Sequence, residues 1–368
     1  MNSSDFDIWA MRQALTLAEH ALYSSSPNPR VGCVLALNNK IIGEGFTQEA
    51  GRNHAEVEAV LDAQRRGNSV AGATAYVTLE PCSHFGRTPP CADMLIANGI
   101  ARVVVAMEDP NPVVSGQGLA RLISAGMDVS VGLMATEATE LNLGFVKRMK
   151  TGLPWFRLKA AISLDGFTAL QNGQSQWITS ESARSDGHHW RARACAILTG
   201  VGTILADDPL LNVRHVATSR QPPRFIVDSH LRIPLTSRIL AEKGITIFYC
   251  LADSHKTQVL AEMGVEVCPL PATESNQVDL TALKAELGRR AYNEVHIEAG
   301  AELNGALIRN KLVNELLIYQ APDLLGGGKK MANLPVLAKL DDKQQLKFSA
   351  IEQVGRDLRI LARFENDV

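Results

Sequence analysis

Residues 77–91 read VTLEPCSHFGRTPPC, and with the upstream tripeptide HAE at residues 54–56 they decide the architecture of the N-terminal half. They supply His54, Cys82 and Cys91 within a short span of the chain. One imidazole and two thiolates are donors that suit Zn²⁺, and three protein ligands leave the fourth tetrahedral position for water. We therefore expect these three residues to hold one zinc ion in an open, catalytic site.

Glu56 is the expected proton carrier of this site. A carboxylate two residues from a helical ligand lies on another face of the helix, so it is not expected to be a further ligand. Zinc lowers the pKa of bound water to about 7, and a neighbouring Glu can take the proton and pass it on. His-x-Glu followed by Pro-Cys is typical of nucleobase deaminases, in which hydroxide adds to a ring carbon and ammonia leaves.

Two other interpretations of the same residues stay open. His84 is near enough in sequence to supply a fourth ligand, which would close the coordination and make the zinc structural. Alternatively, the residues hold no metal. The spacing also departs from the commonest deaminase pattern, because eight residues rather than two separate Cys82 from Cys91.

The N-terminal half alternates helix and strand patterns, which favours an α/β fold with helices packed on a largely parallel or mixed sheet. Asn38 and Asn39 separate the first two strands and predict a hairpin, because asparagine tolerates positive φ. The predicted strands cover residues 31–37, 40–45, 73–79 and 102–106, and the predicted helices cover residues 8–23, 54–66, 92–98 and 136–149.

The segment KRMKTGLPWF at residues 147–156 predicts a domain boundary. It combines positive charge near a helix end with Gly152 and Pro154, which are helix stop signals. We therefore expect one domain over residues 1–150 and a second α/β domain over residues 151–368. In the second domain the predicted strands cover residues 155–161, 196–199, 225–228, 245–250, 295–298 and 316–320, and the predicted helices cover residues 182–194, 257–263, 280–290 and 301–310.

The C-terminal half lacks a G-x-G-x-x-G run after its first strand, so a Rossmann domain is not predicted. Two glycine features are candidates for a phosphate cradle, namely Gly300 before a predicted helix and the glycines at residues 326–328. Amides at a helix N-terminus favour an anion. Many α/β turns carry glycine only to pass a bend, so this interpretation stays open.

Composition and charge exclude several partner classes. With 37 basic and 39 acidic residues, the chain has no large positive field that would bind nucleic acid.

The N-terminus does not resemble a signal peptide, and no apolar run reaches the length of a membrane span, which is about 18 residues. The other cysteines lie in apolar runs typical of buried thiols: Cys33, Cys195, Cys250 and Cys268. We expect a cytoplasmic enzyme that acts on small molecules without a membrane partner; a homo-oligomer stays open.

Several motifs in order identify a family. The chain contains PNPRVGCV at residues 27–34, HAE at 54–56, the stretch at 77–91 and DPNP at 109–112. On these motifs it resembles the bifunctional deaminase/reductase of riboflavin biosynthesis, and the resemblance covers nearly the whole chain. It implies a cytidine-deaminase-like three-layer α/β/α N-terminal domain. The implied substrate is a diaminopyrimidinone that carries a ribosylamino 5-phosphate and loses its exocyclic amine at ring position 2.

The resemblance also implies substrate-binding residues in the first domain. His84, Arg87 and Asn111 match family positions that hold this substrate, and a cation with two polar side chains can bind phosphate and pyrimidine edges. The chain departs from the family at Thr47, where histidine usually follows Gly-aromatic. Threonine keeps a hydroxyl but lacks the reach and the titratable ring of histidine.

The second half carries the reductase motifs of the same family: KAAISLDG at residues 159–166, SQWITS at 175–180, the run at 203–214, IVDS at 226–229 and IEAG at 297–300. The resemblance implies a dihydrofolate-reductase-like α/β domain that uses NADPH to reduce the ribosyl side chain to ribityl, with the cofactor supplying the difficult chemistry. Family cofactor positions fall on Ala161, Trp177, Thr203, Asp207, Ser229, Gly300, Ala301, Glu302, Leu303, Asn304, Gly305 and Ala306. Family substrate positions fall on Ser175, Arg191, Leu211, Arg214 and Glu298. Arg191 and Arg214 suit a clamp for the 5-phosphate, because guanidinium offers paired donors.

Two rival functions remain. A nucleoside or transfer-RNA deaminase with a recognition module would show a basic patch and no NADPH binding. A sensor with a structural zinc would keep its activity without Glu56.

Overall fold

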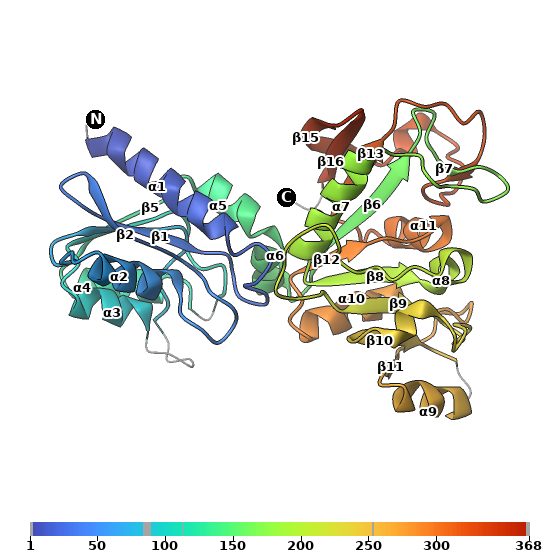
Figure 1. Cartoon of the computed structure of the whole chain (residues 1–368), viewed down its shortest axis with the longest axis horizontal. Helices are drawn as coiled ribbons and strands as arrows, with labels where there is room; N and C mark the ends of the chain where they lie inside the picture. Colours follow the sequence, from blue (N-terminus) through green and yellow to red (C-terminus); the bar gives the residue numbers. More distant parts are fainter. Residues whose placement is uncertain (1–2, 84–89, 113, 252–253, 366–368) are drawn as a thin grey trace. The chain divides into compact units, whose positions relative to one another are not determined.

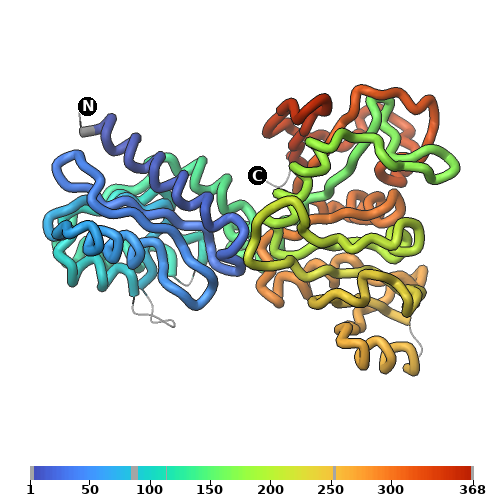
Figure 2. The backbone as a smooth tube through the Cα atoms, viewed as in Figure 1, coloured from blue at the N-terminus to red at the C-terminus, as the bar shows by residue number. Residues whose placement is uncertain are grey.

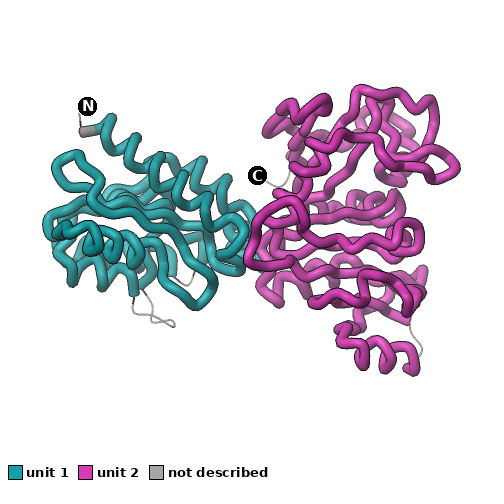
Figure 3. Tube along the Cα trace, viewed as in Figure 1, with its two compact units in different colours: residues 1–152 teal, residues 153–368 magenta. Residues whose placement is uncertain are grey.

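The computed structural model describes residues 3–83, 90–112, 114–251 and 254–365, and it divides into two compact units, Met1–Gly152 and Leu153–Val368 (Figure 3). Gly152 ends α6 (Leu143–Thr151) with a φ of 74°, and its N–H donates to the Arg148 carbonyl at 2.8 Å. Positive φ is easily adopted by glycine, and Pro154 two residues later cannot continue a helix. None of the helices in the described ranges is long and apolar enough to span a membrane.

Unit 1 contains a mixed sheet, which in the described residues has the strand order β2-β1-β3-β4-β5. Its strands are β1 (Gly32–Leu37), β2 (Lys40–Phe46), β3 (Thr74–Val77), β4 (Arg102–Val105) and β5 (Asp128–Val131). β1 pairs antiparallel with β2 and β3, whereas β3, β4 and β5 are parallel. Asn38 and Asn39 have φ values of 51° and 56°, which confirms the predicted hairpin turn.

Helices cover both faces of this sheet and make three layers (Figure 1). α1 (Ser3–Glu19) and α5 (Ala135–Leu141) share one apolar core with alternate strand residues such as Val34 and Val104. α2 (Ala55–Arg65), α3 (Cys91–Ala97) and α4 (Gln117–Ser124) share the other core with the intervening residues. α1 and α5 are far apart in sequence yet lie side by side (Figure 2).

The helix predicted over residues 136–149 is interrupted at Asn142, which separates α5 from α6. The Asn142 side chain accepts from the Arg30 N–H at 2.8 Å and donates to the Arg30 carbonyl at 2.9 Å. These two bonds connect Asn142, where the helix is interrupted, to the loop before β1. The residues around Asn142 give no sequence signal for these bonds. The prediction of one continuous helix was therefore wrong, and α4 and β5 were not predicted.

Unit 2 contains a larger sheet, which within the described residues has the order β11-β10-β9-β8-β12-β6-β13-β16-β15. From β11 to β13 the neighbouring strands are parallel, and β16 and β15 add two antiparallel strands at one edge. The parallel strands are β6 (Trp155–Ile162), β8 (Ala196–Gly200), β9 (Arg224–Val227), β10 (Ile245–Tyr249), β11 (Glu266–Pro269), β12 (Glu294–Ile297) and β13 (Glu315–Gln320).

The helices of unit 2 also lie on two faces. α10 (Leu280–Arg289) and α11 (Ala301–Arg309) pack on one core with Phe156, Leu198 and Val295. α7 (Glu181–Arg193), α8 (Val201–Asp207) and α9 (Ser254–Glu262) pack on the opposite side. On the α7 side, β6 and β12 carry Arg157, Lys159, Glu294 and His296 in place of apolar residues, and Arg157 and Glu294 form a buried ion pair there.

The predicted strands and helices of unit 2 are all found, within one to three residues at each end. The hairpin β15 (Leu346–Val354) and β16 (Asp357–Phe364) was missed. β15 has no fully buried residue, although Leu346, Phe348 and Ala350 alternate with polar residues as in a strand. The elements β7 (Phe167–Ala169), β11, β14 (Lys329–Lys330) and α8 were also not predicted.

Candidate functional site

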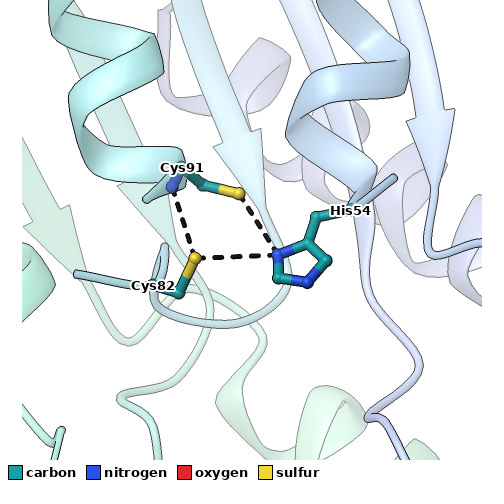
Figure 4. A group of neighbouring side chains, drawn as sticks. All are labelled: His54, Cys82 and Cys91. Atoms are coloured by element: carbon teal, nitrogen blue, oxygen red, sulfur yellow. Dashed lines mark hydrogen bonds between the residues drawn. The ribbon is translucent and has the colours of Figure 1, made fainter. Parts of the chain in front are cut away.

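His54, Cys82 and Cys91 come together in unit 1 from three separate segments (Figure 4). His54 is the N-cap residue of α2, Cys82 lies in the loop after β3, and Cys91 is the first residue of α3. The His54 Nδ1 atom lies 3.6 Å from the Cys82 sulfur and 3.3 Å from the Cys91 sulfur. The Cys91 N–H also donates to the Cys82 sulfur at 3.3 Å, which holds the two thiols side by side.

The spacing of these atoms fits a zinc ion. Tetrahedral zinc with bonds of about 2.3 Å to sulfur and 2.0 Å to nitrogen separates those ligand atoms by about 3.5 Å. The three ligand atoms all lie within 4.8 Å of one another, so one ion can reach them together. In the described residues this is the one group of His, Cys, Asp or Glu side chains arranged in this way.

The thiols and the imidazole influence one another strongly. A hydrogen bond from Cys91, supported by His54, lowers the pKa of Cys82 to about 4 against the opposing effect of burial. The same hydrogen bond together with burial raises the pKa of Cys91. The surroundings of Cys82 therefore favour its deprotonation, and thiolate is the form of cysteine that ligates metals.

Glu56 lies beside this cluster and is 4% exposed. Burial, with a smaller contribution from Cys82, raises the pKa of Glu56 to about 7, while His54 opposes the rise. The Cys91 thiol also opposes the rise in the pKa of Glu56. A carboxyl group with a pKa near neutrality can both take and release a proton at neutral pH.

Asn111 belongs to the loop between β4 and α4 and is half-buried. Its N–H donates to the Asp109 carboxylate at 2.9 Å, and its carbonyl accepts from the Ser115 N–H at 2.9 Å. His84 and Arg87, the other substrate residues predicted for this domain, lie outside the described residues.

Thr47 is buried immediately after β2 and contacts the backbone of Val31. Its N–H donates to the Val31 carbonyl at 2.9 Å, and its hydroxyl accepts from the Val31 N–H at 3.3 Å. The hydroxyl thus serves the pairing of β2 with the loop before β1.

The second cluster of polar side chains surrounds Glu298, which directly follows β12. Arg191 of α7 donates to both carboxylate oxygens of Glu298, through Nε and, at 3.0 Å, through Nη2. Lys159 Nζ lies 3.8 Å from the carboxylate, and His296 Nε2 lies 3.3 Å from it. Burial alone would raise the pKa of Glu298, yet the Arg191 and Lys159 cations hold it well below its usual value. Glu298 is therefore a fixed anion.

Arg214 adds a further cation near the cluster around Glu298. It is exposed, and its Nη1 donates to the Asn212 side chain at 2.7 Å. Burial and the neighbouring Arg191 cation lower the pKa of Arg214. Leu211 is buried with a φ of 50°, and Ser175 is half-buried in the loop between β7 and α7.

Most of the predicted cofactor positions lie along one edge of the unit 2 sheet. Strands β9, β8, β12 and β6 are consecutive parallel neighbours, so their carboxyl ends lie at the same edge. Ala161 lies near the end of β6, and Ser229 follows β9 by two residues. Thr203 and Asp207 belong to α8, which starts where β8 ends. Ligands of open α/β sheets bind outside such an edge.

Trp177 is 67% exposed, and the Arg184 guanidinium lies 4.3 Å from its ring centroid. A large exposed indole held by a cation is a surface on which a planar ligand can stack.

Residues 300–306 form the N-cap and first turns of α11. Gly300 has no side chain to cap the helix, which leaves amides for an anion. Three members of the segment instead contact the chain around residues 331–333: the Glu302 carboxylate accepts from Asn333, Asn304 donates to the Met331 carbonyl at 2.8 Å, and a Cβ on Gly305 would lie 2.2 Å from the Asn333 carbonyl. Ala301, Leu303 and Ala306 complete the segment.

The glycine run at residues 326–328 is held by Asp165. The Asp165 carboxylate accepts from the N–H groups of Leu325 and Gly326 at 3.0 and 2.7 Å, and from the Ser163 hydroxyl at 2.5 Å. These two amides already have a protein anion as partner. Of the two phosphate cradles considered, the turn at Gly300 is the better candidate.

Sequence reasoning did not assign two residues of the second cluster, Lys159 and His296. Lys159 opens the KAAISLDG motif, and His296 lies two residues before Glu298, so alternation along a strand could have placed it on the same face.

Both halves of the chain match known protein families. The family described as "RibD C-terminal domain" matches residues 154–360, and "Cytidine and deoxycytidylate deaminase zinc-binding region" matches residues 4–107. The riboflavin biosynthesis protein RibD of Escherichia coli is 47% identical over 96% of this chain and 98% of its own length. The RibD of Haemophilus influenzae is 42% identical over 97% of each chain.

Solved structures of similar proteins match this fold over nearly the whole chain. Acinetobacter baumannii RibD has a TM-score of 0.88 at 40% identity and covers 98% of this chain and 99% of its own. A Thermotoga maritima protein named as a diaminohydroxyphosphoribosylaminopyrimidine deaminase/5-amino-6-(5-phosphoribosylamino)uracil reductase has a TM-score of 0.86 at 29% identity, with 98% and 99% coverage.

These matches confirm the predicted fold class, with a cytidine-deaminase-like unit followed by a dihydrofolate-reductase-like unit. They also decide against both rival functions, since the second half matches a reductase domain and the whole chain matches enzymes. A zinc-binding deaminase region and a reductase domain imply a zinc ion and a nucleotide cofactor. The chain belongs to the RibD family of riboflavin biosynthesis proteins, which are bifunctional enzymes with a deaminase domain and a reductase domain.

Proposed function

We propose that this chain catalyses two consecutive reactions on a pyrimidine ribosyl phosphate. The first is hydrolytic deamination of 2,5-diamino-6-(5-phosphoribosylamino)pyrimidin-4(3H)-one to 5-amino-6-(5-phosphoribosylamino)uracil, by a domain over residues 1–150 with one zinc ion. The second is NADPH-dependent reduction of the ribosyl side chain to ribityl, by a domain over residues 151–368. The two family matches over residues 4–107 and 154–360 support this division.

The single observation that carries the deaminase proposal is the convergence of His54, Cys82 and Cys91 with Glu56 beside them. Zinc held by these three ligands would supply an activated water at neutral pH. Glu56 is buried next to that position, where its carboxylate can take a proton and deliver it to the ring nitrogen and the departing amine. Asn111, His84 and Arg87 are the proposed substrate contacts.

In the reductase domain, Glu298 and its cations are the proposed substrate site. Arg191 holds Glu298 in place through two donors, and Arg214 offers an exposed guanidinium to the 5-phosphate. Ser175 and Leu211 complete the proposed substrate contacts. NADPH would lie along the carboxyl edge of β9, β8, β12 and β6, with its phosphates at the turn of Gly300. Bound there, it supplies the hydride.

Three further expectations belong to the proposal. The thiol ligands need a reducing compartment, which supports a cytoplasmic enzyme. Its partners are small molecules, and the formal charge of −2 gives no support for nucleic acid. A homo-oligomer is compatible with these points.

The decisive experiment gives purified protein the diaminopyrimidine phosphate and follows ammonia release and then NADPH oxidation. Glu56→Gln should abolish ammonia release while reduction of the separately supplied deaminated compound continues. Loss of neither signal in this variant, or no ammonia from the unsubstituted protein, would overturn the deaminase proposal.

A further inference from the structure

Glu80 is a buried carboxylate that the mechanism above does not use. It lies between β3 and Pro81, two residues before the proposed zinc ligand Cys82, and is 5% exposed. Its two oxygens accept from four backbone N–H groups: Oε2 from Asp109 at 3.0 Å and Gly116 at 2.9 Å, and Oε1 from Gly118 at 2.8 Å and Leu119 at 3.3 Å. A charged acceptor makes stronger hydrogen bonds than a neutral one, so this carboxylate is a strong anchor for all four amides.

The four amides belong to one functional segment. Asp109 and Gly116 lie on either side of Asn111 in the loop before α4, and Gly118 and Leu119 are in the first turn of α4. The N-cap residue of α4 is Gly116, which has no side chain to accept from these amides. Glu80 caps these amides from the loop after β3, and a negative charge at a helix N-terminus is also favoured by the helix dipole.

Two further contacts show how closely α4 packs against residues 81–83, the segment that contains Cys82. A Cβ on Gly118 would lie 2.0 Å from the Pro81 carbonyl, so the helix start touches the residue before Cys82. From the same helix, Arg121 donates to the Ser83 carbonyl at 3.3 Å and forms an ion pair with Asp93 of α3. α4 therefore contacts the residues on both sides of Cys82, namely Pro81 and Ser83.

A chain of contacts leads from Glu80 to Asn111. The Asp109 N–H donates to Glu80, and the Asp109 side chain in turn accepts from the Asn111 N–H at 2.9 Å. The Asn111 carbonyl accepts from Val114 and Ser115, which closes the loop on itself. Through these bonds the Glu80 carboxylate links the segment that carries Asn111 to the segment that leads into Cys82.

We infer that Glu80 is a positioning residue of the deaminase, which sets Asn111 at the correct place beside the zinc ligands. This inference rests on the proposed function, because Asn111 is a proposed substrate contact. It assigns Glu80 no contact with substrate or metal. Its loss should weaken substrate binding, while the zinc ligands and Glu56 remain able to perform the chemical step.

Glu80→Gln is the informative variant, because it keeps the shape but replaces one acceptor oxygen with a donor that faces backbone donors. We expect the KM for the diaminopyrimidine phosphate to rise at least about tenfold, which corresponds to the loss of about one to two hydrogen bonds. The kcat should change less than about threefold, as for lost uniform binding. Zinc content and the reductase activity of the same chain should be unchanged. Glu19→Gln, an exposed carboxylate of α1, is the control and should match the unsubstituted protein.

A double-mutant cycle with Asn111→Ala separates positioning from general support of the fold. If Glu80 acts through Asn111, the double variant should show the KM of Asn111→Ala alone, because coupled residues are not additive. Additive effects, an unchanged KM in Glu80→Gln, or a fall in kcat together with zinc loss would each overturn the inference. Absence of ammonia release by the unsubstituted protein would instead reject the proposed function itself, so the two failures are distinguishable.

Discussion

The guanidinium of Arg191 donates to both carboxylate oxygens of Glu298. This pair fixes Glu298, which follows β12, against α7, which carries Arg191. A third Arg191 nitrogen, Nη1, donates to the Asn212 carbonyl at 3.0 Å. Both residues are at least four-fifths buried, and the pair joins two segments that are 107 residues apart. Planar two-point pairing of this kind is specific to arginine.

Arg191→Lys should therefore damage the reductase although it keeps the charge. Lysine cannot donate to both oxygens of Glu298 and to Asn212 at once. Losing one to two charge-assisted hydrogen bonds predicts a fall in reductase kcat/KM of about 10- to 100-fold. NADPH oxidation with the deaminated compound measures it, with ammonia release by the same protein as reference. Arg289→Lys on the exposed side of α10 is the matched control; equal losses in both variants would contradict the argument.

Cys91→Ser should remove zinc from unit 1. Serine has no thiolate, and a change outside the ligand shell already costs about 10- to 100-fold in metal affinity, so a lost ligand should cost at least about 100-fold. Zinc affinity measured by competition with a chelating dye tests this, and reductase activity should persist. Cys250→Ser in unit 2 serves as control because it is outside the metal cluster. Unchanged zinc affinity in Cys91→Ser would exclude Cys91 as a ligand.

Much of the fold was accessible from the sequence because buried parallel strands appear as short apolar runs. Residues 245–249 and 316–320 are of this kind, and the structure confirms a strand at each place. The candidate metal cluster was accessible for a different reason: one histidine and two cysteines beside a glutamate form a donor set typical of zinc, and the structure brings the three ligand atoms together.

What escaped prediction depends on partners distant in the chain. Asn142 interrupts a helix because its side chain bonds the backbone of Arg30, 112 residues away. β15 buries none of its residues fully and is held by pairing with β16, and the alternation of Leu346, Phe348 and Ala350 with polar residues was overlooked. Glu80 lies inside a recognisable motif, but its four backbone partners lie 29 to 39 residues further along the chain. Such long-range contacts cannot be inferred from local composition.

Asp165→Asn should loosen the glycine run near residue 326. The carboxylate accepts from the N–H groups of Leu325 and Gly326, whereas an amide side chain can offer only one oxygen and brings a donor. Hydrogen exchange at these two amides should accelerate at least about fivefold, as expected from loss of about one hydrogen bond. Asp341→Asn, at an exposed position, should leave both rates unchanged. Equal protection in Asp165→Asn would show that another group holds the turn.

His188 should make unit 2 less stable in mild acid. Burial, followed by the Arg191, Arg214 and His215 charges, lowers the pKa of His188 to about 4 from its ordinary 6.5, and Glu298 opposes this. Between these values the unfolded chain binds a proton that the folded chain does not. Stability from this residue is therefore present above pH 6.5 and is lost as the pH falls toward 4, on the order of 1–3 kcal/mol.

His188→Asn is the test of this pH dependence. Its side-chain oxygen can still accept from the Arg214 N–H, which donates to His188 Nδ1 at 3.2 Å, but it does not titrate. Denaturant unfolding followed by tryptophan fluorescence should show a flatter fall in unfolding free energy between pH 6.5 and 4 than the unsubstituted chain. An identical slope in the two proteins would place the acid sensitivity elsewhere.

Gly187→Ala should stabilise unit 2 without touching its chemistry. Gly187 lies inside α7, its φ is not positive, and an added Cβ would meet no atom within 4 Å. Glycine in a helix interior costs about 1 kcal/mol relative to alanine, so the unfolding free energy should rise by about 0.5–1 kcal/mol. Gly305→Ala in α11 is the opposite case, because its Cβ would collide with the Asn333 carbonyl, and that variant should unfold more easily. Equal stabilities for the two variants would mean that α7 and α11 are not packed as described.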